Sequence, residues 1–292
     1  MKIDKNKIEY FLFRSILFVL NKLGLEKTRK FASIVGIFIY YFVPIRRSTA
    51  ISNLQKAFPQ KSKSEIRSIT RKNYQSITIT FFELMLIPHL SQAVIDSQVE
   101  CPGLNLIGEK LKSGKGIILL TAHFGNWEFI ISYLAPKLDG KFNVLVKPQR
   151  NPYITKWLEE TRHIAHTKII PTGVSVKSIY QALAKGEVVL IAGDQRGHKD
   201  GPRLRFFNQP TSYYTGTAAI VNRTKCELLI GLIQRKKDFT YKLTIRELDI
   251  ANLPEMEEDR ISLLTQNYIS LLEEYVKETP EQYFWMHKLW KY

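Results

Sequence analysis

The stretch GIILLTAHFGNWE, residues 116–128, places a short apolar run directly before a cluster of polar side chains. The run has the length and composition of a buried strand. His123 follows it at once, and Glu128 comes five residues later. Functional groups of α/β proteins gather at the carboxyl ends of strands. The pattern therefore indicates a site at the end of this strand.

His123 and Glu128 can cooperate only if the chain turns between them. On an unbroken helix, side chains five residues apart diverge by about 140°. Gly125 permits a tight bend, and Asn126 can cap a helix whose first turn contains Glu128. We expect Glu128 to bind one ring nitrogen of His123, so that the other nitrogen takes a proton from a hydroxyl as a general base. The alternatives for His123 are a core histidine and a metal ligand.

After Pro102 the chain alternates between short apolar runs and helical stretches, which predicts an α/β fold with a sheet flanked by helices. The runs are residues 116–122, 142–147, 168–171, 187–193, 226–232 and 239–248. Asp194-Gln195-Arg196-Gly197 ends one of them and leads into a loop rich in glycine and basic residues, 198–210. This is a second polar cluster at a strand end.

Arg162 lies between the two clusters, in a helix-like segment at residues 151–164. It can form a structural ion pair with Asp194, because such pairs are frequent. Alternatively, Asp194 orients Arg162 toward a phosphate or an acyl carbonyl. The residues alone leave both alternatives open.

Two apolar segments, residues 8–20 and 31–45, open the chain. Both are shorter than a membrane span. Cationic residues flank them: Lys2, Lys5, Lys7, Lys22, Lys27, Arg29, Lys30, Arg46 and Arg47. We interpret residues 1–47 as hydrophobic helices that associate with a membrane surface, ahead of a catalytic domain at residues 48–292. The alternative is a pair of ordinary core helices.

The 292 residues include 43 Lys and Arg against 27 Asp and Glu, a net charge of +16. Such a surplus attracts nucleic acid, anionic lipid headgroups or an acidic carrier protein. The sequence has no zinc-finger spacing, helix-turn-helix signature or aromatic-basic ribonucleoprotein motif, which argues against nucleic acid. Cys101 and Cys226 lie far apart, so neither a disulfide framework nor a zinc site is predicted. With no signal-peptide cleavage site, a location facing the cytosol fits best.

Residues 48–91 have a helical pattern that Pro59 interrupts, and we expect a second helix to begin near Ser64. Glu83 lies in the apolar stretch FFELML, residues 81–86. A buried carboxylate without a partner is costly, so we expect a structural ion pair at Glu83.

From about Arg46 to the C-terminus the chain resembles the bacterial lipid A biosynthesis (lauroyl/myristoyl) acyltransferases, part of the wider lysophospholipid acyltransferase superfamily. The matching elements, in chain order, are NLQKAFP (53–59), Glu83, HFGNWE (123–128), the Asn-Pro pair at 151–152 with Arg162, DQRG (194–197), FFNQP (206–210), Gly216 and EQYFWMHKLWK (281–291). The resemblance implies a mixed sheet flanked by helices, a core like that of the glycerolipid acyltransferases.

In that family the histidine of the HxxxxE motif activates the acceptor hydroxyl, and the acyl group arrives as a thioester of acyl carrier protein or coenzyme A. The resemblance therefore implies His123 as the base and Glu128 as its orienting partner. The implied substrate contacts are Gly125, Asn126, Arg162, Asp194, Arg196 and Gly216. The amides after Asn126 and the Arg162 side chain are candidate donors to the tetrahedral oxyanion.

No metal and no cofactor is implied. The implied partners are the acyl thioester, an anionic lipid or glycolipid acceptor and the cytosolic face of the inner membrane. The chain departs from the family at Arg196, where a second acidic residue is often found, and at Phe206-Phe207-Asn208, which replaces an FFG-type turn. Both departures concern the choice of acceptor.

Three other functions compete with this prediction. The acceptor can be a lysophospholipid or another glycolipid, because the same core motif serves many acceptors. A metal-dependent hydrolase would use His123 and Glu128 as ligands, but no second cluster has suitable spacing for the three or four ligands needed. The third is a catalytically silent membrane-binding protein. For His287, in the aromatic segment YFWMHKLW, we expect a packing role because its neighbours have large apolar areas.

Overall fold

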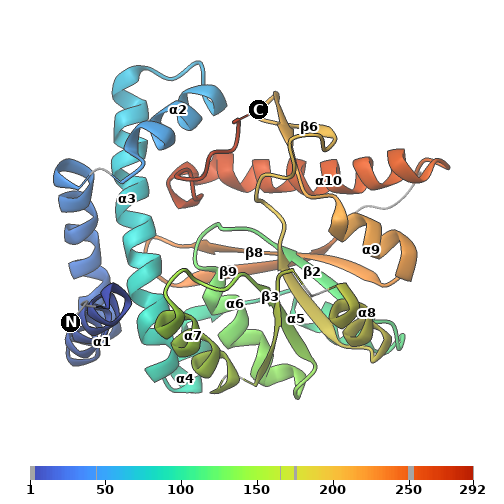
Figure 1. The fold of residues 1–292 in the computed structure, drawn as a ribbon, viewed down its shortest axis with the longest axis horizontal. Coiled ribbons are helices and arrows are strands. Elements are labelled where there is room, and N and C mark those ends of the chain that lie inside the picture. Colours follow the sequence, from blue (N-terminus) through green and yellow to red (C-terminus); the bar gives the residue numbers. More distant parts are fainter. Residues whose placement is uncertain (1–3, 44, 165, 174–175, 249–252, 292) are drawn as a thin grey trace.

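The computed structural model describes residues 4–43, 45–164, 166–173, 176–248 and 253–291 (Figure 1). Lys2, one of the expected flanking cations, and Pro44, near the end of the second apolar segment, lie outside these ranges.

A seven-stranded mixed sheet forms the centre of the molecule, in the order β1-β9-β8-β2-β5-β3-β4 (Figure 1). Its strands are β1 (Val99–Glu100), β2 (Ile117–Thr121), β3 (Phe142–Val146), β4 (Thr167–Pro171), β5 (Val188–Ala192), β8 (Glu227–Arg235) and β9 (Tyr241–Glu247). The antiparallel pair β8–β9 makes the sheet mixed, since the other neighbours run parallel. All six apolar runs of the sequence are strands, so the predicted α/β fold is confirmed.

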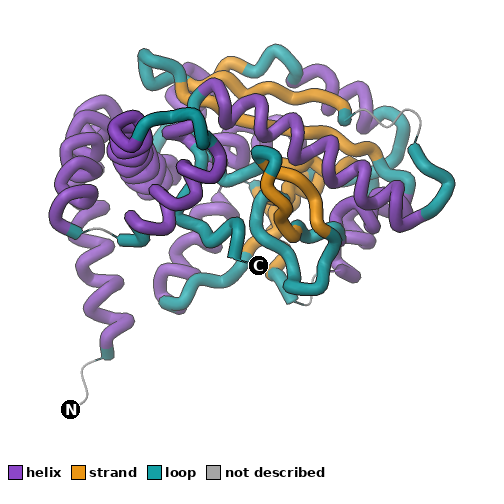
Figure 2. The backbone as a smooth tube through the Cα atoms, turned by 90° about the horizontal axis from the view of Figure 1, so that it is seen from above, coloured by secondary structure: helices purple, strands orange, loops and turns teal. Residues whose placement is uncertain are grey.

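Helices cover both faces of the sheet, and the alternation of side chains along β2 divides the core between them. Ile118 and Leu120 pack with the cluster that contains α10 (Glu257–Glu278), whereas Ile117 and Leu119 pack with the cluster that contains α6 (Trp127–Leu134). Seen from above, a long helix lies over the sheet and runs in nearly the same direction as its longest strands (Figure 2), and Figure 1 identifies this helix as α10. The other helices around the sheet are α4 (Gln92–Gln98), α5 (Leu104–Leu111), α7 (Pro152–Ile164), α8 (Val176–Ala184) and α9 (Gly216–Thr224).

The segment that follows Asp194 differs from the loop expected from its composition. Within residues 198–210 the strand β6 (Arg203–Phe206) begins a hairpin, and β7 (Gln209–Ser212) pairs with it in antiparallel register. Phe207 and Asn208 form the turn with positive φ angles of 51° and 58°. Leu204 and Phe206 are buried while Arg203 and Arg205 are exposed, so only one side of β6 is apolar, and its short alternation was masked by the basic residues.

The two N-terminal apolar segments form one kinked helix, α1 (Lys5–Phe42), with non-helical backbone angles at Gly24. It packs against α3 (Lys63–Leu86), which belongs to the region expected to form the catalytic domain (Figure 1). Many large apolar side chains of α1 stay exposed, among them Phe11 and Phe42, each 71% exposed. Taken singly, no helix among the described residues has the length and apolar character needed to cross a membrane.

Two further helices, α2 (Arg47–Ala57) and α3, account for the predicted helical region. The helix expected to begin near Ser64 is α3, which begins at Lys63, but its capping residue is Ser62 and not Ser64. Ser62 caps the helix, and Glu65 closes a capping box with it. Both Ser62 and Ser64 precede an apolar repeat, but only Ser62 has a Glu three residues later.

Candidate active site

His123 and Asp194 meet at the carboxyl edge of the sheet, although they follow different strands. The parallel pair β2–β5 aligns Thr121 with Ala192. Each side chain comes two residues later, so the register brings them together. His123 Nδ1 lies 2.8 Å from Asp194 Oδ1. Asp194 is buried, whereas 23% of the His123 side chain is exposed, so one side of the imidazole is open to a substrate.

The predicted hydrogen bond between Glu128 and the His123 ring was wrong. Glu128 Oε1 instead accepts from Arg162 Nη2 at 2.8 Å. The Arg162–Asp194 ion pair, one of the two alternatives for Arg162, does not form either. Each acid binds the partner expected of the other: Glu128 binds Arg162, and Asp194 binds His123. The physical reason is the α6 cap, which turns Glu128 toward α7, while the strand register delivers Asp194 to the ring.

The charges around His123 favour its protonated form. Burial alone lowers the pKa of the imidazole, but the charge of Asp194, the hydrogen bond to it and the charge of Glu128 outweigh burial and raise the pKa above its ordinary value. Glu128 therefore lies close enough to act on the His123 imidazole through its charge while it is bonded to Arg162.

The turn between His123 and Glu128 forms as predicted. Gly125 has a φ of 61°, and a Cβ built on it would lie 1.9 Å from the carbonyl oxygen of Ile233. Only glycine fits this position, because both the conformation and the close approach exclude a side chain. The Asn126 side chain accepts from the Glu128 amide at 3.2 Å and so caps α6.

Aromatic rings and the C-terminal segment, residues 280–291, enclose the histidine. The Trp127 ring lies 4.9 Å from the imidazole between ring centroids, and the Phe284 ring 6.3 Å. The Phe284 amide donates to the His123 carbonyl oxygen at 3.0 Å. The sequence indicated a packing role for His287 of this segment and no role for Trp127 or Phe284, so both were missed as walls of the site. Trp127 lies in HFGNWE and Phe284 in EQYFWMHKLWK, two motifs that match the family, and this match was the signal in the sequence that could have identified them.

His287 belongs to the same segment. Its neighbours Trp285 and Leu289 are buried in the core, which confirms packing as their role. The His287 carbonyl oxygen accepts from Asn53 Nδ2 at 2.7 Å. Burial, opposed by the charge of Asp194 and assisted by Arg196, His123 and Arg46, lowers the pKa of the His287 imidazole. It therefore stays neutral more readily than an exposed histidine.

Arg196 follows Asp194 by two residues, whereas Gly216 lies further along the chain, at the start of α9. Arg196 donates to the Lys288 carbonyl oxygen at 3.0 Å and pairs through its backbone with Tyr213, so it ties the Asp194 loop to the C-terminal segment. Gly216 begins α9, and a Cβ there would meet no protein atom within 4 Å. The fold therefore does not require glycine at 216, and its predicted substrate contact stays a prediction, as does that of Arg196.

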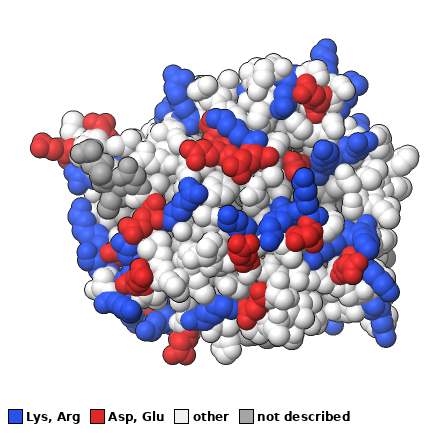
Figure 3. Space-filling view, turned by 180° about the vertical axis from the view of Figure 1, so that it is seen from behind, with Lys and Arg blue, Asp and Glu red and all other residues white. Residues whose placement is uncertain are grey.

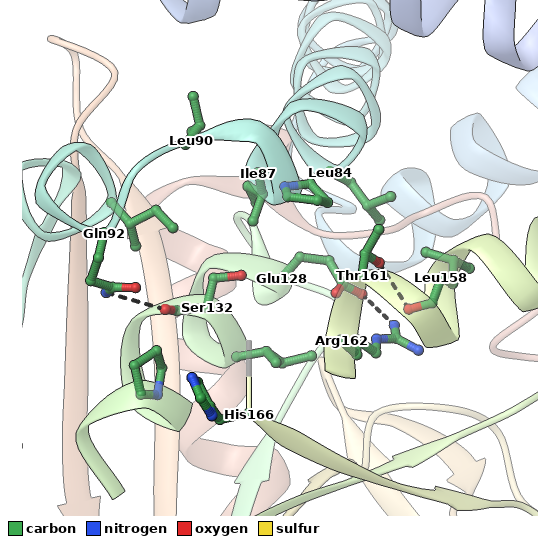
Figure 4. Close-up of a pocket in the computed structure, with 14 residues that line it drawn as sticks. Leu84, Ile87, Leu90, Gln92, Glu128, Ser132, Leu158, Thr161, Arg162 and His166 are labelled. Carbon is green, nitrogen blue, oxygen red and sulfur yellow. Dashed lines mark hydrogen bonds and ion pairs between the residues drawn. The ribbon is translucent and has the colours of Figure 1, made fainter. Parts of the chain in front are cut away.

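A cavity of about 250 Å³ opens beside the Glu128–Arg162 pair (Figure 4). Apolar side chains form much of its wall: Leu84, Ile87, Leu90, Ile95, Ile131 and Leu158. Arg162 Nε is buried and has no hydrogen-bond partner among the described residues, so it keeps a free donor. Gln92, Ser132, Thr161 and His166 also line the cavity, so it combines apolar side chains with polar ones, one ion pair and one unused N–H.

Glu83 forms the structural ion pair expected from its burial. Its Oε1 lies 2.6 Å from Arg29 Nε, and its Oε2 lies 3.8 Å from Arg235 Nη2. Within the described ranges, no group of three or more His, Cys, Asp or Glu side chains is placed to hold a metal ion.

Comparison with known proteins matches residues 3–292 to the model of a family described as bacterial lipid A biosynthesis acyltransferase. The chain is 23% identical to a lipid A biosynthesis palmitoleoyltransferase of Escherichia coli (strain K12) over 268 residues, 88% of this chain and 82% of the relative. It is 25% identical to a lipid A biosynthesis lauroyltransferase of the same strain over 256 residues, 86% and 80%. A lipid A biosynthesis acyltransferase of Haemophilus influenzae is 23% identical over 257 residues, 87% and 79%.

Proposed function

Because the chain belongs to the bacterial lipid A biosynthesis acyltransferases, a family of acyl-transferring enzymes, we propose that it moves a fatty acyl group from a thioester to a hydroxyl of a lipid A precursor or related glycolipid. The donor is acyl carrier protein or coenzyme A. The palmitoleoyl and lauroyl groups in the relatives' names belong to those proteins, and we assign no chain length here.

The His123–Asp194 hydrogen bond is the observation that carries this proposal. Asp194 accepts from Nδ1–H, which leaves Nε2 as an acceptor on the open side of the ring. In the proposed reaction Nε2 takes the proton of the acceptor hydroxyl while the oxygen attacks the thioester carbonyl. The tetrahedral intermediate then collapses: the carbonyl re-forms, the C–S bond breaks, and the departing thiolate receives the proton from His123. Asp194 stabilises the imidazolium that forms between the two steps.

We assign the developing oxyanion to Arg162. The amides of Glu128 and Phe129 already donate to the side chain and carbonyl of Asn126, so they are not free for a substrate. Arg162 keeps its Nε–H unused beside the cavity. Arg162 Nη2 of the same guanidinium donates to Glu128, and this bond fixes the direction in which the Nε–H group points.

The cavity beside this pair is our candidate for the acyl chain. Its apolar side chains suit a hydrocarbon, and the Glu128–Arg162 pair in its wall marks where the polar thioester would lie (Figure 4). The chain would then lie along Leu158 and Ile131, away from the solvent.

We further propose that residues 1–47 hold the enzyme at the cytosolic face of the inner membrane. The exposed apolar side chains of α1 support this, because a surface rich in exposed aromatic residues is unfavourable in water. The excess positive charge favours an anionic lipid surface, a phosphorylated acceptor and an acidic carrier protein. On the face drawn in Figure 3 the basic side chains are interspersed with acidic ones, so attraction there would be diffuse.

The test is transfer of labelled acyl chains from acyl carrier protein or coenzyme A to a panel of lipid A precursors and lysolipids, with wild type and His123→Ala compared. We expect transfer to a lipid A precursor that is abolished in the variant. Transfer that survives in His123→Ala would exclude the base mechanism. Transfer to a lysolipid alone would exclude the proposed acceptor, and no transfer to any acceptor would exclude the activity. Metal analysis of the purified protein distinguishes a metal-dependent hydrolase.

A further inference from the structure

Glu83 stands at the centre of a buried polar cluster that reaches the catalytic turn. It is completely buried in α3. Its Oε1 accepts from Arg29 Nε of α1 at 2.6 Å. Its Oε2 accepts from Asn126 Nδ2 at 2.9 Å and from the Tyr241 hydroxyl of β9. One carboxylate therefore joins the N-terminal helix, the sheet and the residue that caps α6.

A second contact from the same helix holds the adjacent residue of the turn. Thr80 Oγ1 donates to the Gly125 carbonyl oxygen at 2.9 Å. Thr80 lies one helical turn before Glu83, so the two side chains share a face of α3. Arg235 Nη2 donates to Thr80 Oγ1 at 2.8 Å and lies 3.8 Å from Glu83, which links the two contacts. Side chains of α3 therefore hold both Gly125 and Asn126: Thr80 bonds to the first and Glu83 to the second.

The held residues lie between the two halves of the site. His123 precedes them and Glu128 follows them, so the orientation of Gly125 and Asn126 sets how the base stands relative to the Glu128–Arg162 pair. The two side chains of the HxxxxE motif do not bond to each other. Their relative placement must therefore come from the turn and from what holds it.

We propose that Glu83 is a positioning residue of the active site, which acts through Asn126 and is itself held by Arg29 of α1. This inference rests on the proposed function of His123 as the base. It gives the N-terminal helix a part in catalysis besides any contact with a membrane, because a displacement of Arg29 reaches the turn through two consecutive hydrogen bonds.

This arrangement suits a carboxylate that only accepts, since each polar partner of Glu83 among the described residues is a donor. Both oxygens accept, one from Arg29 and the other from Asn126 and Tyr241. A glutamine has one accepting oxygen and one NH₂ group. Whichever way the amide faces, it would present N–H to a donor on one side and lose that contact. Glu83→Gln therefore perturbs the cluster with almost no change in shape.

Glu187 offers a matched control. It is also a buried carboxylate with two donors, Lys168 Nζ at 2.7 Å and Asn143 Nδ2 at 2.8 Å. It precedes β5, while Asp194 follows that strand, so it lies at the opposite end of the sheet from the site. Glu187→Gln makes the same chemical change without touching the catalytic turn.

The test compares acyl-transfer kinetics of Glu83→Gln, Glu187→Gln, Asn126→Ser and the double variant Glu83→Gln/Asn126→Ser, with rates expressed per folded molecule. Serine keeps a helix-capping oxygen but removes the amide that donates to Glu83. We expect Glu83→Gln and Asn126→Ser each to lower kcat roughly 10- to 100-fold, with a smaller change in KM, because a misplaced group is costly to the reaction step. The double variant should lose no more than either single one.

Losses that multiply in the double variant would overturn the proposal, as would equal kcat values for Glu83→Gln and Glu187→Gln. If Glu83→Gln does not fold, Asn126→Ser decides alone, and an unchanged kcat in that variant refutes the positioning role. Hydrogen exchange at the Gly125 and Asn126 amides gives an answer that does not depend on the reaction. Faster exchange in Glu83→Gln than in Glu187→Gln supports the role even if His123→Ala shows that the base is another group; equal exchange contradicts it.

Discussion

Asp194 Oδ1 lies 2.8 Å from His123 Nδ1, although 71 positions separate the two residues in the chain. The register of two neighbouring parallel strands creates this bond, and it determines which ring nitrogen carries the proton. The acid of the sequence motif, Glu128, takes a different role as the partner of Arg162. The four groups therefore form two pairs, His123 with Asp194 and Arg162 with Glu128; in the proposed function the first pair is the base and the second contacts the substrate.

Replacement of Asp194 by asparagine should disable the base without changing its surroundings. We expect kcat to fall roughly 10²- to 10⁴-fold, since the imidazole loses the acceptor that fixes its tautomer and stabilises its charge. The Asp194 charge raises the pKa of His123, so its removal lowers that pKa. A base works when it is neutral, and the acid limb of the kcat/KM profile should move to lower pH. A limb that stays in place would show that Asp194 does not act on the base.

Glu128→Gln should give a different signature. Its charge is a lesser cause of the raised pKa of His123 than that of Asp194, so the acid limb should move less than in Asp194→Asn. We expect a fall in kcat of roughly 10- to 100-fold because Arg162 loses the charged partner that aims it. Steady-state kinetics over a range of pH would measure both effects. A shift larger than that of Asp194→Asn would contradict the assignment of partners.

Gly125→Ala should destabilise the fold as well as the site. The added Cβ would overlap the Ile233 carbonyl oxygen at 1.9 Å and occupy a positive φ. We expect the free energy of unfolding to fall by about 3 kcal/mol or more. Gly108→Ala is the control, because Gly108 lies in α5 with no atom within 4 Å of the added Cβ, and it should gain about 0.4–1 kcal/mol. Chemical denaturation measures both, and equal losses in the two variants would argue against the close approach.

The proposed acyl cavity predicts a change of chain-length preference. Leu158→Trp adds volume to a partly exposed wall of the cavity, so donors with shorter chains should be favoured over longer ones. Leu158→Ala should relax the preference toward longer chains. Competition between acyl donors of different length measures the ratio of kcat/KM values. The same ratio in wild type and in both variants would place the acyl chain elsewhere.

If the exposed apolar side chains of α1 contact a membrane, their replacement should weaken membrane binding without a loss of stability. A triple change of Phe11, Phe38 and Phe42 to serine removes side chains that are 55–71% exposed. We expect weaker cosedimentation with phosphatidylglycerol-containing vesicles and little change in the free energy of unfolding. Val176→Ser, at another exposed apolar position, should bind vesicles as the wild type does. Unchanged binding of the triple variant would exclude this part of α1 as the contact.

Local sequence determined the elements and the turn. Six apolar runs became strands of the sheet because their length and composition suit burial. Gly125 and Asn126 formed the predicted bend and cap, since both effects act within a few residues. The ion pair at Glu83 followed from the cost of burying a lone charge. The β6–β7 hairpin was missed because its strands are short and the basic residues of one face hid the alternation.

The pairing of charges was decided by tertiary structure alone. Sequence spacing placed Glu128 nearest to His123, but it holds no information about which strands become neighbours. Once β2 lies beside β5 in register, Asp194 reaches the imidazole and Glu128 is left facing Arg162 on α7. Of the two aromatic walls, Trp127 is close to His123 in the chain, whereas Phe284 reaches the imidazole only because the C-terminal segment crosses the turn. The sequence by itself determined that His123 stands at a strand end with a carboxylate in reach; only the packing of distant strands and helices decided which carboxylate it is.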